Sequence, residues 1–267
     1  MIDVHCHMLP AIDDGARDLS MALQMAEMAV ADGISRTVCT PHIYPGLFEN
    51  THESIRQATA DFQQELKTAG IALQVSYGAD VQVVPSLVQG LQSKALPTIN
   101  GSRYFLFEPP HHVSMPRLAD LIHAALLAGY VPVITHPERL SYIEDDYDLF
   151  IKAARQGAWL QLTGGSLLGV FGSRVQRVAE RFMEDGVIHL LASDGHNLKN
   201  RSPVLTEARK AAAQIVGDEE ANLLVQARPL AIINNEDAAT TALPPGLNSK
   251  VPYKRPSRRR WWSRLMS

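Results

Sequence analysis

The chain has 267 residues, of which 46% are hydrophobic and 20% are charged, as is typical of a globular protein. Its length suits one large α/β domain or two small ones. No apolar run approaches the ~18 residues that a membrane span needs, so the sequence predicts no membrane-spanning helix. The net charge is −3, but the body is acidic and the C-terminal segment is basic; the acidic body disfavours nucleic acid as a partner of that segment.

Two features indicate a cytoplasmic location. The sequence starts on residues that look functional, which leaves no room for a signal peptide. Cys6 and Cys39 both fall in predicted strands, as expected of reduced, buried thiols rather than of a disulfide framework.

Strand-like and helix-like segments alternate along the chain, and glycines such as Gly33 and Gly129 mark the helix ends. In chain order, the pattern predicts strand 2–4, helix 20–32, strand 36–40, helix 51–68, strand 72–78, helix 86–92, strand 103–107, helix 116–128, strand 131–135, helix 146–156, strand 158–162, helix 174–185, strand 187–192, helix 203–216 and helix 218–227.

This alternation is typical of an α/β protein with a parallel sheet. About seven strands in a chain of this length suggest a distorted TIM-like barrel, one strand short of the standard eight. We expect residues 1–243 to form this domain. Residues 244–267, rich in proline and arginine, are a different kind of segment.

Histidines and carboxylates cluster just past the predicted strand ends. The carboxyl ends of parallel strands meet on one face of a barrel, where active sites lie. Asp14 would reach the same face from the first loop. The complete set is His5, His7, Asp14, His42, Asp80, Glu108, His136, Asp194 and His196.

Five histidines and four carboxylates are too many donors for one ion and suit two or three divalent cations. Mixed nitrogen and oxygen ligation points to Mn²⁺, Fe²⁺ or Zn²⁺, with Mn²⁺ preferred. The absence of thiolates in this set argues against a structural zinc site. Three such ions and four carboxylates leave roughly two positive charges, which favours an anionic substrate.

Two arginines follow ligand-bearing strand ends closely. Arg139 lies in His136-Pro-Glu-Arg139, and Arg201 lies five residues after His196. A guanidinium binds phosphate oxygens through two parallel hydrogen bonds. A phosphate group is therefore the natural anion for this site, and Arg139 and Arg201 are its candidate catalytic residues.

These motifs resemble the polymerase and histidinol phosphatase (PHP) superfamily, whose fold is a distorted seven-stranded barrel with a trinuclear metal site. The chain is more closely similar to the bacterial PHP-type protein-tyrosine phosphatases of capsule and exopolysaccharide operons. The resemblance spans residues 1 to about 230. It rests on Asp3-Val-His5-Cys-His7, Asp13-Asp14-Gly15, Thr40-Pro-His42, Tyr77-Gly-Ala-Asp80, Phe107-Glu108, Thr135-His136-Pro-Glu-Arg139 and Ala192-Ser-Asp194-Gly-His196-Asn.

The resemblance implies that the histidines and carboxylates above match metal ligands, and that Arg139 and Arg201 bind phosphate. The sequence departs from the family at Asp80, where these phosphatases usually have glutamate. The shorter side chain puts the spacing or affinity of the ions in doubt there. Asp13 is an alternative to Asp14 as a ligand, and the sequence does not choose between them.

The implied activity is metal-assisted hydrolysis of phosphotyrosine, with an activated water attacking phosphorus in line. Tyrosinate, whose parent pKa is ~10, leaves without a dedicated general acid. The implied partner is the tyrosine-phosphorylated tail of a bacterial autokinase that controls capsule synthesis. A thiol mechanism is not expected, because neither Cys6 nor Cys39 has an arginine six residues later.

Other residues carry weaker expectations. His111 and His112 follow Pro110 and are expected to be exposed loop residues. His123 in a predicted helix and His189 in a predicted strand are expected to be packing residues. Tyr44 and Phe48, beside His42, are weak candidates for flanking an aromatic substrate.

The last 24 residues carry seven basic and no acidic side chains, so residues 1–243 have a net charge of −10. Such a tail cannot bury enough apolar surface to fold alone, and a solubilising disordered extension is the simplest interpretation. Weak docking on anionic membrane is the alternative, through the basic residues and through Trp261 and Trp262.

Three other functions stay open at this level. One is a small-molecule phosphatase of the same family, acting on a substrate such as histidinol phosphate. Another is a metal-dependent amidohydrolase, which is disfavoured because no lysine stands at a strand end to bridge the metals. The third is a non-catalytic metal-binding module.

Overall fold

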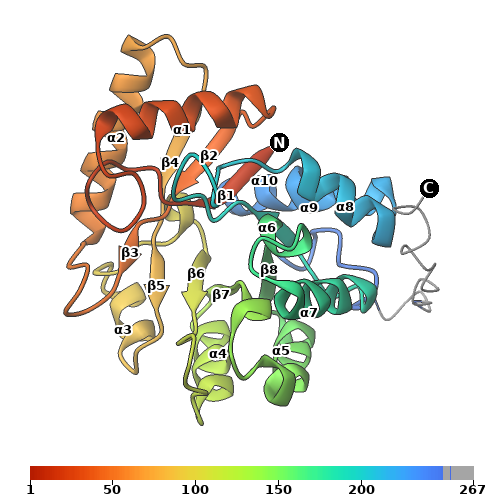
Figure 1. Ribbon diagram of the computed structural model, residues 1–267. Coiled ribbons are helices and arrows are strands. Elements are labelled where there is room, and N and C mark those ends of the chain that lie inside the picture. Colours follow the sequence, from red (N-terminus) through yellow and green to blue (C-terminus); the bar gives the residue numbers. More distant parts are fainter. Residues whose placement is uncertain (249–252, 254–267) are drawn as a thin grey trace, which may run out of the picture.

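The computed structural model describes residues 1–248 and Tyr253. Helices lie around the outside of a central set of strands (Figure 1). The strands are β1 (Ile2–Cys6), β2 (Arg36–Cys39), β3 (His42–Ile43), β4 (Gln74–Tyr77), β5 (Asp80–Gln82), β6 (Tyr104–Glu108), β7 (Val131–Thr135), β8 (Trp159–Thr163) and β9 (Leu190–Ala192).

The helices follow the predicted ranges closely where capping and glycine signals mark their ends. Thr51, for example, caps α2 by accepting a hydrogen bond from the backbone N–H of Ser54. The helices are α1 (Leu19–Ala31), α2 (His52–Thr68), α3 (Leu87–Gln92), α4 (Leu118–Leu127), α5 (Ile143–Gln156), α6 (Gly164–Leu167), α7 (Ser173–Glu184), α8 (Thr206–Val216), α9 (Asp218–Val225) and α10 (Ala227–Ile233), with short 3₁₀ turns η1 (Ile99–Gly101) and η2 (Pro137–Arg139).

The strands form two sheets in which every pairing is parallel, so the predicted α/β class with parallel strands is confirmed. One sheet has the order β1-β2-β4 and the other has the order β3-β5-β6-β7-β8-β9. The described residues therefore contain nine strands rather than about seven. Among them, no helix is both long and apolar enough to cross a membrane.

The difference in strand number arises at two places. The second predicted strand breaks at Thr40-Pro41, because proline has no N–H to donate to the ladder, and resumes as β3. The third predicted strand, 72–78, corresponds to β4, and β5 begins two residues beyond it and was not predicted. His42 and Asp80 are the first residues of β3 and β5, and they also lie three residues past the ends of β2 and β4, in line with their predicted position after a strand end.

The two sheets meet where β1 lies beside β9. Cys6 and Gly195 form a parallel bridge, and the amide of Asp194 donates to the carbonyl of His5 over 2.8 Å. The buried Asp3 strengthens this junction by accepting from the amide of Ser193 at 3.0 Å and from its hydroxyl at 2.5 Å. Burial raises the pKa of Asp3 to about 6. Closure of both sheets into one barrel stays a prediction.

Two predicted histidine environments can now be compared with the structure. His189 is buried and stacks on Trp159 with ring centroids 5.0 Å apart, which confirms its packing role. His123 lies on the exposed side of α4, so its predicted packing role was wrong. Its neighbour Ile122 is the residue of that turn that faces the core.

The start of the basic tail lies against α7. The amide of Gly246 donates to the carbonyl of Gly186 over 2.8 Å, and the hydroxyl of Tyr253 donates to the carbonyl of Glu184 over 3.0 Å. The predictions for residues 249–252 and 254–267, including disorder and membrane docking, lie outside the described residues. The domain boundary after residue 243 stays a prediction.

Candidate metal centre

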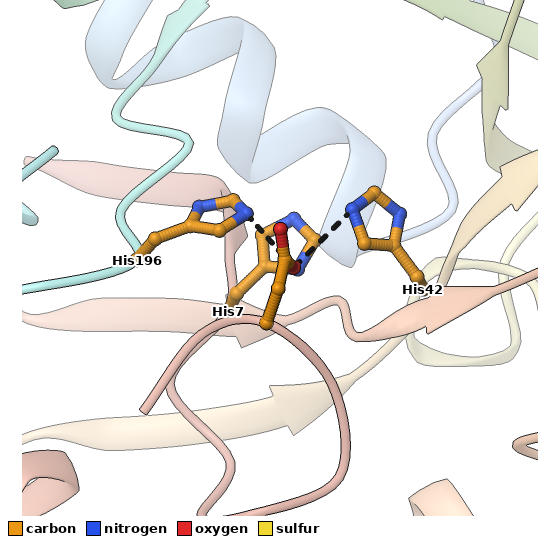
Figure 2. A group of neighbouring side chains, drawn as sticks. His7, His42 and His196 are labelled. Carbon is orange, nitrogen blue, oxygen red and sulfur yellow. Dashed lines mark ion pairs between the residues drawn. The ribbon is translucent and has the colours of Figure 1, made fainter. Parts of the chain in front are cut away.

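The predicted ligand residues come from segments spread over nearly two hundred positions, and their side chains lie together in one site, here called the mouth. Figure 2 shows His7, His42 and His196 turned toward one another. The Oδ1 atom of Asp14 lies 3.5 Å from Nε2 of His42 and 3.3 Å from Nε2 of His196. These four residues have donor atoms close enough together to hold one cation.

A second group lies deeper. The Nε2 atoms of His5 and His7 are 3.2 Å apart, and Nε2 of His5 lies 3.3 Å from Oδ2 of Asp80. All three side chains are fully buried. Since His7 belongs to both groups, the two candidate cation positions are neighbours.

Glu108 is at the centre of the remaining contacts. Its Oε2 lies 3.4 Å from Nδ1 of His42, and its Oε1 lies 3.5 Å from Nε2 of His111 and 3.9 Å from Nε2 of His136. Asp80 links this group to the deeper one, since its Oδ2 is 3.8 Å from Nδ1 of His42. All nine predicted ligand residues are thus brought to one place.

Three of the histidines, His5, His7 and His196, are held by a hydrogen bond on Nδ1. Nδ1 of His5 donates to Oε1 of Gln161 at 2.8 Å, and Nδ1 of His196 donates to the carbonyl of Asp194 at 2.9 Å. Such partners orient the ring, so that Nε2 faces the cluster and offers its lone pair once the imidazole is neutral. Imidazoles arranged in this way are ready to bind a cation.

The neighbours Asp13 and Asp14 have different surroundings. Asp13 accepts from Nδ1 of His7 at 2.6 Å, from the amide of Gly15 at 3.0 Å and from the amide of His42 at 3.1 Å. Its oxygens are therefore engaged in holding His7 and the loop. Asp14 instead points its carboxylate at the imidazoles, which is the geometry expected of a ligand.

The turn that separates these two carboxylates from β1 requires glycine at position 15. A Cβ on Gly15 would lie 2.1 Å from the carbonyl oxygen of His7. The close approach lets the amide of Ala16 donate to that carbonyl over 3.1 Å. The loop consequently closes over His7 and carries Asp14 to the mouth.

Two residues of the cluster have unusual backbone conformations. His136 has φ of 34° and Asp194 has φ of 51°, both in the left-handed region that favours glycine. Strain of this kind gathers at functional sites, where it re-aims a side chain. Both residues follow directly after a strand or one residue beyond it, so the turn sends their side chains across the mouth.

Arg139 and Arg201 lie together, as predicted. Both donate to Oδ2 of Asp194, Arg201 at a distance of 2.8 Å. Burial by itself raises the pKa of Asp194, but His5 and these two guanidiniums hold it well below the usual value. The other oxygen, Oδ1, faces Nε2 of His5 at 3.4 Å. Asp194 therefore joins the arginines to the imidazole cluster.

Glu138 fixes the turn that carries Arg139. It is fully buried, and its Oε1 accepts from the amide of Thr163 at 2.9 Å and from the hydroxyl of Ser166 at 2.6 Å. Burial raises the pKa of Glu138 to about 7. These bonds tie η2 to the end of β8 and to α6, so Arg139 is anchored from below.

The imidazoles differ in how readily they hold a proton. Burial and the neighbouring His196 lower the pKa of His7 to about 4. Burial and Arg139 lower the pKa of His136 to about 4. Burial works in the same direction on His5, but Asp80 and Asp194 raise its pKa to about 9.

Several buried atoms of the cluster fit a cationic group. Among the described residues, hydrogen-bond partners are missing for both oxygens of Asp80, Oδ1 of Asp194, Nδ1 of His42 and Nε2 of His196. Buried carboxylates and imidazoles are costly without a partner unless a cation binds them. Nitrogen and oxygen donors without thiolate suit divalent ions such as Mn²⁺, Fe²⁺ or Zn²⁺.

Sequence reasoning missed two residues of the site. Gln161 supports His5 from β8, and the only signal in the sequence is an amide within an otherwise apolar strand. His111 is half-buried and its ring lies 5.0 Å from that of His136, so the expectation of a fully exposed loop was wrong for it. His112 is exposed, as expected.

The two cysteines lie apart from this chemistry. Cys6 and Cys39 are free and fully buried on neighbouring strands. Burial raises the pKa of both thiols above the usual value. Since the thiolate is the reactive form, neither cysteine is suited to act as a nucleophile.

Known proteins with similar sequences include named tyrosine-protein phosphatases. Residues 1–234 match the family model described as "Capsular polysaccharide synthesis, CpsB/CapC". Tyrosine-protein phosphatase YwqE from Bacillus subtilis (strain 168) is 36% identical over 236 residues, which cover 88% of this chain and 92% of YwqE. Tyrosine-protein phosphatase CpsB from Streptococcus pneumoniae is 28% identical over 241 residues, or 88% of this chain and 99% of CpsB.

Solved structures agree with this grouping. One from a study of YwqE from Bacillus subtilis and CpsB from Streptococcus pneumoniae, described as unique metal-dependent tyrosine phosphatases, superposes with a TM-score of 0.85 at 34% identity. It covers 89% of this chain and 96% of that one. A probable 2-pyrone-4,6-dicarboxylic acid hydrolase from Acinetobacter baumannii, with a TM-score of 0.53 at 16% identity, covers 87% of this chain and 98% of its own; it shares the fold alone.

The family model thus covers most of the chain. YwqE is more than one-third identical to it over nearly the whole length of YwqE. This confirms the family expected from the motifs. The chain belongs to the CpsB/CapC family of capsular polysaccharide synthesis proteins.

Proposed function

We propose that the chain is a metal-dependent phosphatase that hydrolyses phosphotyrosine in proteins. One observation carries the proposal: five imidazoles and four carboxylates from distant segments share one mouth with two arginines. The relatives named tyrosine-protein phosphatases support the same activity. We include in the proposal that the two sheets close into a single distorted barrel around this mouth.

The proposed ligands of two or three divalent ions are the nine predicted residues. The first cation position would use Asp14, His42 and His196, and the deeper one His5 and Asp80; His7, whose Nδ1 is held by Asp13, would give its Nε2 to one of the two. A third position would draw on a set shared with its neighbours: His42, Asp80, Glu108, His136, Asp194 and, in addition, His111. Mn²⁺ is the proposed metal, with Fe²⁺ or Zn²⁺ as alternatives.

When bound, the ions would lower the pKa of a coordinated water and neutralise phosphoryl charge. The residues of the chain supply the rest. Arg139 and Arg201 would turn from Asp194 to the equatorial oxygens of the phosphoryl group, which lie within reach of the same mouth. The leaving tyrosinate needs no general acid because its conjugate acid, a phenol, is acidic for a hydroxyl group, with a pKa of ~10.

Metal removal is the direct test. Chelation should abolish hydrolysis of a phosphotyrosine peptide, and added Mn²⁺ should restore it. Blocking thiols in a parallel sample should change little, because Cys6 and Cys39 are buried. Activity that survives chelation but is lost on alkylation would contradict the metal mechanism.

The finer part of the proposal concerns the substrate. We propose the tyrosine-phosphorylated tail of a bacterial autokinase that controls capsule or exopolysaccharide synthesis. A small-molecule phosphatase and a non-catalytic metal-binding module are the alternatives. Turnover of a phosphorylated kinase tail should far exceed turnover of histidinol phosphate, and equal rates would favour the small-molecule reading.

A cytoplasmic location, with residues 244–267 in weak contact with anionic membrane, belongs to the same proposal. Seven basic side chains in that segment would each contribute ~1 kcal/mol near an anionic surface. Co-sedimentation of full-length and 1–243 protein with anionic liposomes tests it. Equal binding of the two proteins would remove the membrane contact.

A further inference from the structure

A tight turn of five residues, Tyr44–Phe48, stands beside the metal centre immediately after β3. The amide of Tyr44 donates to the carbonyl of Phe48 over 3.0 Å, and the amide of Phe48 donates back over 2.9 Å. Gly46 supplies the φ of +84° at the tip, and its amide donates to Oε1 of Glu49 at 2.6 Å. The turn is therefore built before any substrate arrives.

The turn lines the same cavity as the two arginines. This cavity, of about 240 Å³, is lined by Tyr44, Leu47 and Phe48 from the turn and by Arg139 and Arg201, among others. One side of the cavity is formed by the side chains of the turn. The other side is formed by the two arginines and by imidazoles and carboxylates of the metal centre and its rim. An apolar wall beside an anion site is what an ester with one charged and one apolar end requires.

Two residues of the turn, Tyr44 and Leu47, are exposed to solvent rather than packed in the core. The side chain of Leu47 is 64% exposed and that of Tyr44 is 37% exposed. Phe48, by contrast, is stacked on His42 with ring centroids 5.8 Å apart and an interplanar angle of 14°. Phe48 thus packs against His42, a proposed metal ligand, while Tyr44 and Leu47 present exposed apolar surface to the cavity.

We propose that Tyr44 and Leu47 form a specificity wall that receives the aromatic ring of an aryl phosphate ester. The inference rests on the proposed phosphatase function and deepens it. A phenyl ring bound there would bury apolar surface on both side chains and could pack edge to face on Tyr44. An alkyl phosphate, such as that of phosphoserine, would leave the wall exposed and gain nothing from it.

Binding of two non-hydrolysable phosphonates to the Mn²⁺-loaded protein tests the wall without the complication of leaving-group chemistry. Phenylphosphonate carries the ring and methylphosphonate lacks it. We expect the double variant Tyr44→Ala/Leu47→Ala to bind phenylphosphonate about tenfold more weakly in calorimetry, and to bind methylphosphonate as the wild type does. Leu127→Ala, which removes a 76% exposed leucine on α4, is the matched control and should change neither affinity.

Equal weakening of both phosphonates would overturn the inference, because the turn would then act only through the metal centre. Unchanged affinity for both would overturn it as well. Failure of the proposed function is distinguishable: selective binding of phenylphosphonate by a wild type that hydrolyses no phosphate ester would remove the phosphatase and leave the wall standing.

Discussion

Two clusters of buried charge lie at opposite ends of β9 and are built differently. At the N-terminal end of the strand, next to His189, the buried Arg228 donates to both oxygens of Glu220, at 2.6 and 3.0 Å. It also donates to the carbonyls of Ala242 and His189. After the strand, Asp194 and the cluster around it contain several buried oxygens and nitrogens for which no hydrogen-bond partner is found in the described residues.

The difference distinguishes a buried charge that stabilises the fold, Arg228, from a buried charge that is available to bind a cation, Asp194. The Arg228 guanidinium is satisfied by fixed partners within the chain, so its burial is already compensated. At the other end the carboxylates face imidazoles, which can hold protons or give way to cations. A buried group with unmet bonding capacity therefore marks the functional end of the strand.

The largest effect is expected from removing a charge at the functional end. Asp80→Asn takes away a fully buried carboxylate between two candidate cation positions. We expect phosphotyrosine hydrolysis to fall on the order of 10³-fold, equivalent to about 4 kcal/mol of transition-state stabilisation. Steady-state kinetics with bound metal measured in the same samples checks this.

Asp80→Glu is the matched control for charge and geometry. It keeps the carboxylate and adds one methylene in a fully buried position. It should bind metal and retain more activity than Asp80→Asn. Equal loss in both variants would show that reach, rather than charge, is what matters at this position.

The opposite result is expected at the structural end. Arg228→Met leaves Glu220 partly buried without its cation, which should lower the free energy of unfolding by about 3 kcal/mol. Activity per folded molecule should stay within twofold, because Arg228 is remote from the mouth. Urea unfolding and kinetics on one preparation test both parts. In the double variant Arg228→Met/Glu220→Leu most of the stability should return; if it does not, the ion pair is not the cause.

Protons should leave the functional end when metal enters. Asp80 and Asp194 raise the pKa of His5 to about 9 against the effect of burial, and the pKa of His42 is raised to about 10, also against burial, by Glu108 and Asp80. Both imidazoles are thus protonated at pH 7 in the metal-free protein. Because a ligand must be neutral, metal binding should release up to two protons, and affinity should rise with pH up to about 10.

Calorimetry of Mn²⁺ binding in two buffers with different ionisation enthalpies measures this release directly. His7 and His136, whose pKa values are lowered to about 4, are already neutral and contribute none. Binding enthalpies that do not depend on the buffer would contradict the predicted protonation of His5 and His42.

A smaller effect is expected at Glu138, the buried carboxylate next to Arg139. Glu138→Ala would leave the amide of Thr163 and the hydroxyl of Ser166 without their acceptor, at a cost of about 2 kcal/mol. Glu138→Gln keeps an acceptor oxygen and should cost less than half of that. Urea unfolding of both variants decides; equal losses would mean that packing, not hydrogen bonding, holds the turn.

The sequence predicted the features that depend on local pattern. Alternation of strands and helices, and the position of His136 directly after a strand, follow from periodicity and turn residues. The different orientations of Asp13, which holds His7, and Asp14, which faces the imidazoles, did not follow, because neighbouring side chains in a loop are sorted by backbone angles. Gln161 was also missed, since its contact with His5 joins residues 156 positions apart.

The structural end of β9 was largely invisible in the sequence for the same reason. Arg228 and Glu220 are eight residues apart on two helices, one of which was not predicted at all. His189 was correctly expected to pack, but its partner Trp159 comes from the neighbouring strand. Patterns within a segment predict elements, whereas pairing between segments needs the fold.

The smallest predicted effect concerns pH and the same histidine. Burial, with a further contribution from Arg228, lowers the pKa of His189 well below its usual value of 6.5. Above pH 6.5 His189 is neutral in both the folded and unfolded states, so its contribution to stability is complete. Below that pH the unfolded state takes up a proton that the folded state refuses, and stability falls by up to ~1.4 kcal/mol per pH unit.

His189→Asn should flatten this acid slope while keeping an acceptor for the amide of Leu160, which now donates to Nδ1 of His189 at 3.1 Å. Urea unfolding of metal-free protein from pH 7.5 to 5.0 measures the slope, and His123→Asn, at an exposed histidine, is the control. If the slopes of wild type and His189→Asn were the same, the acid sensitivity would belong to the imidazoles of the mouth, and the structural end of β9 would be indifferent to pH.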